Sequence, residues 1–454
     1  MDQTGQTMRA RAIAAHRAGR RDEARALYAR LLARAPQDAG IWTNLGVLLR
    51  EAGAHDLALA AQERAFALAP ESRAVLNNLA NILGDIGENT RALALRRRLI
   101  AANPDSPAQR AMAGKALRAL GRHDEGIRLL EDALAHHPGD AELRIQLALT
   151  RLAAGDHARG FRNYAARWQT GELTPREMTV PKWDGGPLHG RRLLVLPEQG
   201  LGDALAFARF LPVLAHHDPG AVLMQAPRPL ARLFAGIDGA GWTGTDPREG
   251  GGFDLWTDLM DLPGLHFAAT DTIPPPARLT VPEDSRARAR ALTAPFRDRF
   301  RIGVVWSGSP TYRGDAFRSF GHRQFHRLLG LPGVQMFALQ KGPGTAGFHA
   351  DGSAALIIDA GSSDRDLADT AALMGEMDLV ITSCTVTAHL AGALGRPVWT
   401  LLHWDPFWMW GHAGAATPWY PSMRLIRQDR PRDWDGVFAR VREGVAALLR
   451  ERSG

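Results

Sequence analysis

The chain of 454 residues contains one cysteine, Cys384, and no run of 18 apolar residues. A single thiol excludes an internal disulfide, and it favours a reducing compartment. The first 20 residues are polar and rich in arginine, without the apolar run of a signal peptide. The missing long apolar run also argues against a membrane-spanning helix. The sequence therefore predicts a cytoplasmic protein without a transmembrane segment.

Lysine is scarce, and nearly all of the basic residues are arginine, with a formal net charge of +7. A basic balance can indicate a nucleic-acid partner. Here the arginines are interspersed with Asp and Glu, and the chain has no uninterrupted basic tract and no aromatic–basic motif of a DNA- or RNA-binding module. We therefore expect no nucleic acid among its partners.

What the chain does contain is a repeat with a period of 34 residues. The period is carried by five glycines and four prolines: Gly19, Gly53, Gly87, Gly121 and Gly155, and Pro36, Pro70, Pro104 and Pro138. In a helix–turn–helix unit of this length, glycine closes the first helix and proline follows the second. Small residues recur where two helices must touch: Ala12, Gly46, Ala80, Gly114 and Ala148, and Ala24, Ala58, Ala92, Gly126 and Gly160. Residues 39–72 resemble the tetratricopeptide repeat, so we expect an α-solenoid over 1–170 that binds partners.

After the repeats the sequence predicts a linker and two α/β units. Residues 171–190 are rich in proline and glycine, and short apolar strands alternate with helices from Arg191 onward. We expect two Rossmann-like units, 191–297 and 298–454, that face each other across a cleft, with a final helix that crosses back over their junction. A chain that begins near Trp183 is then expected to fold alone. The expected strands are 193–196, 221–225, 254–257, 302–306, 335–340, 356–359, 379–382, 398–402 and 424–426.

The turn from Glu198 to Asp203 follows a strand and opens a helix, but it is not a dinucleotide fingerprint, because Leu205 stands where the third glycine would be. The run PEQGLGDALAFARFLPVL at 197–214 resembles the lipopolysaccharide heptosyltransferase family, which has the GT-B fold. VVWSGSPTYRGDAFRSF at 304–320, LQKGPG at 339–344 and DLADTAALMGEMDLVITSCTVTAHLAGALGRPVWTLL at 366–402 resemble its donor-binding half. The likeness covers about 183–445, and it is strongest to bacterial proteins that join tetratricopeptide repeats to such a domain.

The resemblance implies an inverting, metal-independent glycosyltransferase. It assigns Asp203 as the general base that takes a proton from the acceptor hydroxyl. Gly200 and Gly202 let the backbone of the turn approach a ligand closely. From the residues alone, Asp203 could equally be an ordinary helix N-cap.

The resemblance also implies a site for a nucleotide-sugar donor, which serves as co-substrate, with no further cofactor and no metal. Thr385 and His389 open a helix directly after a strand, where amide groups can receive a diphosphate. The remaining donor-binding candidates are Ser307, Ser309, Arg318 and Lys341. His389 could instead be a packed core histidine, and the serines could only cap a turn.

Cys384 departs from the family, which has an aspartate at this position. A thiol at a helix N-terminus can be acidified, but displacement by a hydroxyl needs no thiol nucleophile. The departure leaves a second interpretation open, a non-catalytic scaffold that keeps a GT-B-like ligand-binding module.

An amide ladder in the repeats predicts the acceptor. Asn44 and Asn78 occupy equivalent positions of adjacent repeats, and Gln146 takes that position two repeats later. This resembles the asparagine ladder of O-GlcNAc transferase repeats, although Ala10 and Met112 interrupt it. We therefore expect a protein or peptide acceptor that is bound by the repeats.

Overall fold

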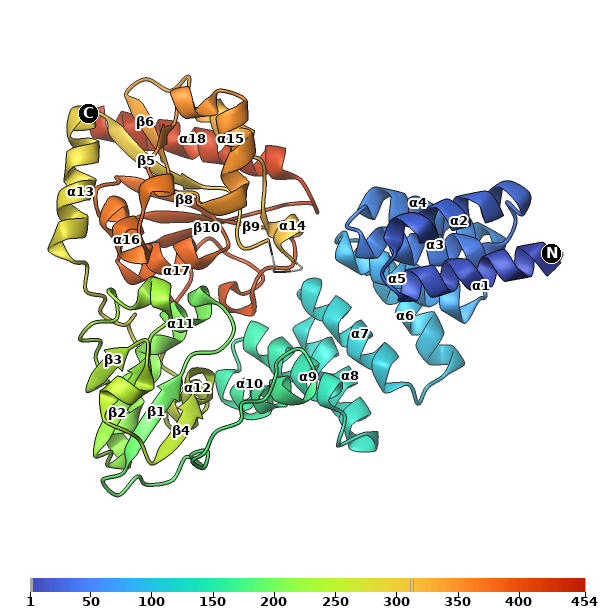
Figure 1. The fold of residues 1–454 in the computed structure, drawn as a ribbon, viewed down its shortest axis with the longest axis horizontal. Helices are drawn as coiled ribbons and strands as arrows, with labels where there is room; N and C mark the ends of the chain where they lie inside the picture. Colours follow the sequence, from blue (N-terminus) through green and yellow to red (C-terminus); the bar gives the residue numbers. More distant parts are fainter. Residues whose placement is uncertain (1–2, 311, 313, 454) are drawn as a thin grey trace. The chain divides into compact units, whose positions relative to one another are not determined.

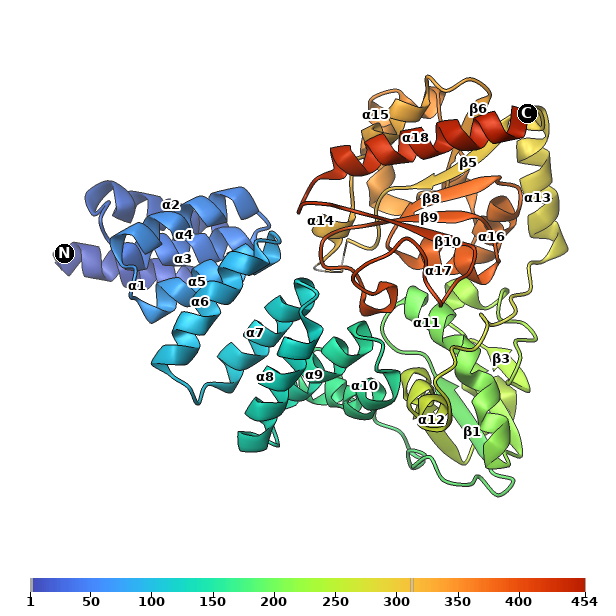
Figure 2. The same ribbon diagram turned by 180° about the vertical axis from the view of Figure 1, so that it is seen from behind.

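The computed structural model describes residues 3–310, 312 and 314–453, and these residues form two compact units that divide between Thr150 and Arg151. Figures 1 and 2 show the helices of the first unit and the two parallel sheets of the second. Within the described residues, no helix combines the length and the apolar character that crossing a membrane requires.

The first unit is an array of antiparallel helix pairs, as the 34-residue period predicts. Its helices are α1 Gln3–Arg17, α2 Arg21–Arg34, α3 Ala39–Glu51, α4 His55–Leu68, α5 Arg73–Asp85, α6 Asn89–Ala102, α7 Pro107–Ala119, α8 His123–His136 and α9 Ala141–Ala153, which ends in the second unit. The five periodic glycines follow the first helix of each pair with φ between 69° and 88°. This left-handed backbone is the reason for glycine at these positions.

A layer of repeat-equivalent side chains crosses between the two helices of each pair. In the pair α3–α4, Thr43 Oγ1 donates to Gln62 Oε1 at 2.8 Å. In α5–α6, Arg96 Nη1 donates to Asn77 Oδ1 at 2.6 Å, and in α7–α8 the equivalent residues are Ala111 and Leu130, both buried. Gly46 and Gly114 are small because a Cβ atom there would lie within 2.4 Å of Gln62 and 2.7 Å of Leu130. The layer is therefore polar in two repeats and apolar in the next.

The second unit begins at Arg151, whereas the sequence placed the end of the solenoid at 170. Helix α10 (His157–Tyr164) and the short 3-10 helix η1 (Ala165–Gln169) pack against the α/β part of the chain. The Phe161 ring lies 5.8 Å from that of Phe267 and 5.7 Å from that of Trp408, measured between centroids. This helix, which the sequence placed in the solenoid, thus belongs to the compact unit of the two sheets.

The first sheet is parallel, with the order β3-β2-β1-β4. Its strands are β1 Arg192–Leu196, β2 Ala221–Gln225, β3 Trp242–Gly244 and β4 Leu255–Asp258. Helix α11 (Leu201–Phe207) follows β1 and continues as the 3-10 helix η2 (Ala208–His217), and α12 (Leu262–Ala269) follows β4. The three predicted strands are present, and the half-buried β3 is an addition to them.

The second sheet is also parallel, with the order β10-β9-β8-β5-β6-β7. Its strands are β5 Phe300–Val305, β6 Val334–Ala338, β7 Ile358–Asp359, β8 Leu379–Ser383, β9 Val398–Leu402 and β10 Met423–Arg427, and its helices are α13 Glu283–Thr293, α14 Asp315–Arg318, α15 Ala346–Ala350, α16 Leu367–Gly375, α17 Val386–Ala393 and α18 Trp434–Ser453. Strand order reverses between β5 and β8, as in a doubly wound sheet.

The terminal helix α18 differs from its prediction. Val437, Phe438, Val441 and Val445 are buried in one core with Ile302, Leu379 and other residues of the second sheet. Figure 2 shows α18 lying along this half. The helix therefore packs on the second sheet, and the expectation that it crosses back over the junction is corrected.

Candidate functional site

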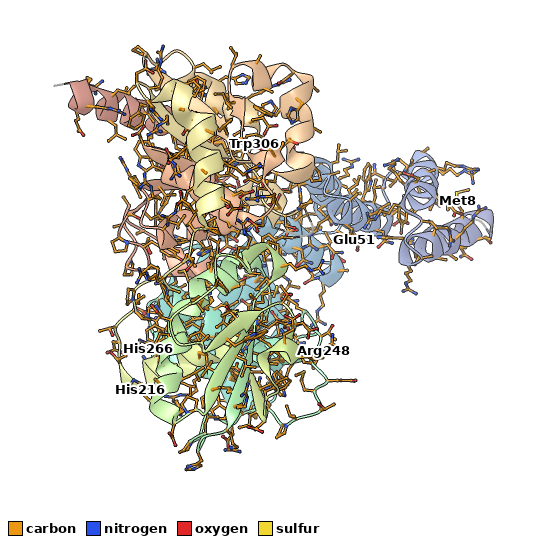
Figure 3. The ribbon with its side chains drawn as sticks, turned by 60° about the vertical axis from the view of Figure 1, so that its left-hand side comes forward. Met8, Glu51, His216, Arg248, His266 and Trp306 are labelled. Carbon is orange, nitrogen blue, oxygen red and sulfur yellow. The ribbon has the colours of Figure 1, made fainter. Side chains whose placement is uncertain are left out.

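Both sheets change strand order at a point where ligands usually bind, outside the carboxyl ends of the strands. In the first sheet this point lies between β1 and β4, so the turn from Glu198 to Asp203 stands there. In the second sheet it lies between β5 and β8, followed by Ser307 and by Cys384 with Thr385. Trp306, labelled in Figure 3, directly follows β5. Asp203, Ser307 and Thr385, which the sequence singled out, thus stand at the two switch points.

Asp203 is half-buried in the first turn of α11, three residues after the N-cap Gly200. Its Oδ2 accepts a hydrogen bond from the Gly200 amide at 2.9 Å. Burial raises the pKa of this carboxyl to about 6, against the lowering effect of backbone amides and of the Arg318 guanidinium. Asp203 is therefore not itself the N-cap, and its pKa suits a base that works near neutral pH.

Helices α11 and α17 from the two switch points touch each other. A Cβ atom on Gly202 would lie 3.0 Å from His389 Cδ2, so glycine permits this approach. His389 is buried, its Nδ1 lies 3.2 Å from the Tyr420 hydroxyl, and its ring stacks on Trp410. Burial, with the charges of Arg209 and Arg318, lowers the pKa of His389 to about 3. His389 is a neutral, packed histidine that can offer a ligand only a hydrogen bond.

Arg318 is one of two cations that act on His389, the other being the buried Arg209. Arg318 Nη1 donates to the Cys384 carbonyl at 3.0 Å, and its Nε donates to Asp315 Oδ1 at 3.0 Å. The backbone at Gly308 passes so close that a Cβ atom there would lie 2.4 Å from Arg318 Nη2 and 2.8 Å from Thr385 Cγ2. Arg318 therefore joins the loop after β5 to the start of α17, where the family resemblance places the diphosphate.

Cys384 is buried, and Trp410 Nε1 donates a hydrogen bond to its sulfur at 3.0 Å. Burial raises the pKa of the thiol. The helix N-terminus does not acidify this cysteine. The thiol is held as a neutral group beside the aromatic loop that connects β9 and β10. Buried side chains from that loop, Trp408, Trp410, Trp419 and Tyr420, pack as an ordered core.

The other donor-binding candidates contact other groups of the protein. Thr385 is buried as the N-cap of α17, with its hydroxyl 2.8 Å from that of Thr387. The Ser307 amide donates to Gln340 Oε1 at 3.0 Å, and the Tyr312 amide donates to the carbonyl of the exposed Ser309 at 3.1 Å. Lys341 Nζ lies 3.0 Å from Asp364 Oδ2, so a carboxylate already compensates its charge.

His403, which directly follows β9, was not among the residues predicted from the sequence. Its Nδ1 is buried without a hydrogen-bond partner among the described residues. Burial lowers the pKa of His403 to about 4, with Arg318 acting in the same direction. The ring lies 5.5 Å from Trp404, which in turn contacts Phe317. Its position at a strand end, next to a strand that the sequence did predict, is the signal that could have found it.

A second missed group is the ionic cluster at the switch point of the first sheet. Buried Arg167 of η1 reaches Glu198 Oε1 at 2.7 Å and Asp261 Oδ1 at 2.7 Å. Lys182 Nζ lies 2.7 Å from the fully buried Asp258 and 2.8 Å from Asp261, and Arg176 contacts Asp258. Three cations from 165–182 thus hold three carboxyl groups at the ends of β1 and β4.

Glu198 gives this cluster a pH dependence. Burial raises the pKa of its carboxyl to about 8, and the neighbouring Asp258 and Asp261 act in the same direction against Arg167. Because the folded state then holds a proton that the unfolded state releases above about pH 4.3, stability falls as pH rises toward 8. The loss is at most about 1.4 kcal/mol per pH unit for one proton.

We predict that Glu198→Gln flattens this dependence, because glutamine mimics the protonated acid and cannot titrate. Melting temperature measured from pH 5 to 9 should fall more steeply in the wild type, and the variant should be the more stable protein at pH 8. Exposed Glu249, with the change Glu249→Gln, is the matched control. Parallel profiles for wild type and Glu198→Gln would contradict the assignment.

Side chains of the predicted amide ladder form hydrogen bonds to other residues of the array. Asn78 Nδ2 donates to Thr43 Oγ1 at 3.2 Å. Gln146 is buried, accepts from Arg118 and donates to Glu142. Asn44 is half-buried. These residues therefore do not form a row of free amides.

No group of three or more His, Cys, Asp or Glu side chains in the described part of the chain has an arrangement that suits a metal ion.

Comparison with known proteins identifies the array. Sequence models of the tetratricopeptide repeat match residues 9–73 and 107–150. These segments are tetratricopeptide repeats. Both matches lie within the first unit.

Protein FlbA of Caulobacter vibrioides is 28% identical over 311 residues, which is 62% of this chain and 51% of FlbA. The chain thus spans about half the length of that relative. Among solved structures, MamA protein is 18% identical with a TM-score of 0.34 and covers 39% of this chain and 100% of MamA. A tetratricopeptide-repeat protein from Parabacteroides merdae is 17% identical with a TM-score of 0.34, at 37% and 67% coverage.

Proposed function

We propose that the protein is an inverting, metal-independent glycosyltransferase of GT-B type that acts on a protein acceptor recruited by its tetratricopeptide repeats. Asp203 takes the proton of an acceptor hydroxyl, whose oxygen attacks the anomeric carbon of a nucleotide sugar. The bond from that carbon to the diphosphate breaks, and the nucleoside diphosphate leaves. This displacement passes through no covalent intermediate, so one base suffices.

The observation that carries the proposal is the meeting of the two switch points. The turn with Asp203 and the start of α17 are joined by the close approach of Gly202 to His389. The Arg318 guanidinium acts to lower the pKa of Asp203, and this supports a site in which a base and a cation for the leaving group act together. The pKa of about 6 leaves Asp203 ionised at neutral pH.

A non-catalytic scaffold is the second candidate, and two observations favour it. Cys384 is a neutral thiol where the resembling family has a carboxylate, and Lys341 is already paired with Asp364. In this case the module would bind a ligand near Arg318 without turnover. Nucleotide binding alone does not separate the two candidates, whereas transfer or hydrolysis does.

The test starts with a screen of nucleotide sugars by thermal shift on the full chain. A ligand at about 100 times its Kd stabilises the protein by about 2.7 kcal/mol, which a melting curve detects. Each hit is then incubated with the protein, and release of the nucleoside diphosphate is measured. Hits with release support the glycosyltransferase, hits without release support the scaffold, and the absence of any hit contradicts both.

We predict that Arg318→Gln weakens binding of the donor found in that screen by about 10- to 100-fold, because a hydrogen bond to a charged group contributes roughly 1.5 to 3 kcal/mol. Glutamine keeps a donor for the Cys384 carbonyl, so the fold should persist. Arg323→Gln is the matched control, since Arg323 is exposed and pairs with Asp351. Equal donor affinity in wild type and Arg318→Gln, measured by calorimetry, would move the donor site elsewhere.

A further inference from the structure

Arg96 on α6 is a buried cation without a carboxylate. Only 3% of the residue is exposed, and the guanidinium donates to the amide oxygens of Asn77 and Asn81 on α5 and of Gln109 on α7. Within the described residues no Asp or Glu forms an ion pair with Arg96. Asp85, an acidic residue of α5, pairs with Arg50 instead. A buried charge that lacks an opposite charge is costly, and neutral amides compensate it only in part.

The guanidinium fixes the orientation of the amides around it. Arginine has N–H donors and no acceptor, so each amide must turn its oxygen toward Arg96 and its NH₂ group away. Gln109 Nε2 then donates to Asn77 Oδ1 at 3.0 Å. The NH₂ groups of Asn77 and Asn81 face away from the cation, on side chains that are half-buried at the surface. This part of the array therefore presents hydrogen-bond donors above a positive charge.

The other arginines of the array do not extend this charge into a basic stripe, and Arg50, whose charge acts on Arg96, is paired with Asp85. Six of them have acidic partners: Arg9 with Asp38, Arg20 with Glu23, Arg91 with Glu63, Arg97 with Glu125, Arg98 with Glu71, and Arg110 with Asp132. A nucleic-acid backbone needs several unpaired cations in a row. One uncompensated cation beneath amide donors fits a single carboxylate instead.

We propose that Arg96, Asn77, Asn81 and Gln109 form a receptor for an acidic side chain of an extended protein segment. The partner's carboxylate accepts from the outward NH₂ groups, and its charge compensates Arg96. The inference rests on the proposed partner-binding role of the repeats and is independent of sugar transfer.

The array supplies its own variant for the test. The equivalent pair in the preceding repeat is Thr43 and Gln62, which is buried, neutral and hydrogen-bonded. Asn77→Thr with Arg96→Gln copies that pair, so it removes the charge and leaves a packing already present in the protein. Asn81→Val, which copies Val47, removes one amide and keeps Arg96. Arg97→Gln removes an exposed, paired arginine of the same helix as the matched control.

Binding is measured by fluorescence anisotropy on the full chain, with a labelled octapeptide of alternating Ser and Glu and its Ser–Gln and Ser–Lys counterparts. We expect the Glu peptide to bind at least tenfold more tightly than the Gln peptide, and more weakly at high salt. The double variant and Asn81→Val should each lose affinity for it, the double variant by tenfold or more, whereas Arg97→Gln should not.

Equal binding of the Glu and Gln peptides, no binding of the Glu peptide to wild type, or full affinity in the double variant would overturn the proposal. A single-stranded oligonucleotide is also added as a competitor. If it displaces the labelled peptide at a lower concentration than unlabelled Glu peptide does, the proposal is overturned in favour of a phosphate ligand. Thermal shift with nucleotide sugars on the same variants separates this outcome from a failure of the proposed transferase, because the double variant should leave that shift unchanged.

Discussion

Asp203→Asn is expected to lower kcat for sugar transfer by about 10² to 10⁴ with donor affinity nearly unchanged. A general base acts only in the transition state, and asparagine cannot take the proton of the acceptor hydroxyl. The wild-type rate should rise with pH through about 6, the pKa of this carboxyl, and then level off. The asparagine variant should lose that rise. Steady-state kinetics between pH 5 and 8 measure both effects.

The fold of the variant should survive, because an asparagine oxygen can still accept the Gly200 amide that Oδ2 accepts at 2.9 Å. Asp238→Asn, at an exposed position of the same half, is the control and should leave kcat unchanged. If the wild type binds a nucleotide sugar but transfers nothing, and Asp203→Asn behaves identically, the scaffold is the correct interpretation.

A chain that begins at Trp183 is expected not to fold, in contrast to the expectation from the sequence. It lacks Arg167, Arg176 and Lys182, which form ion pairs with Asp258 and Asp261 in the structure, and Arg167 also donates a hydrogen bond to Glu198. Loss of one partner of a buried ion pair costs about 3–5 kcal/mol. Loss of a buried phenylalanine such as Phe161 costs a similar 3–5 kcal/mol. Together these losses approach the whole stability of a typical domain, about 5–15 kcal/mol.

A chain that begins at Arg151 retains α10, η1 and the ionic cluster, and we expect it to fold. Soluble yield, circular dichroism and a cooperative melting transition distinguish the two chains. A monomeric, cooperatively melting protein from residue 183 onward would show that the segment 151–182 contributes little, and would restore the boundary that the sequence indicated.

The strands were predictable because each buried parallel strand is a short apolar run. The predicted range 398–402 is β9 as observed, and 221–225 is β2. Strand β3 was missed because Trp242–Gly244 is three residues long and half-buried, with no such run. The unit boundary was missed because α10 continues the 34-residue period, while the rings it packs against, Phe267 and Trp408, are far away in sequence.

The site residues divide in the same way. Asp203, Arg318 and Thr385 could be proposed from the sequence because they stand next to turns and strand ends, and their roles stay predictions. His389 could be proposed for its position, but its pKa depends on burial between Tyr420, Trp410 and Gly202, which the sequence does not reveal. Arg96 was overlooked because an isolated arginine in a helix reads as a solvated residue, and its partners come from two other helices.

The contacts of Arg96 give the repeats a fixed order. Gln109, which accepts from Arg96, lies on the following repeat. The equivalent positions of three other repeats hold Ile41, Val75 and Leu143, all buried and apolar, whereas the first repeat has the exposed Thr7 there. If the repeat 73–102 were followed by any of these three repeats, the guanidinium would meet a hydrocarbon in place of an amide. The repeats are alike in backbone but not interchangeable. Duplication or shuffling of the repeat 73–102 in evolution would also require substitutions in the repeat that follows it.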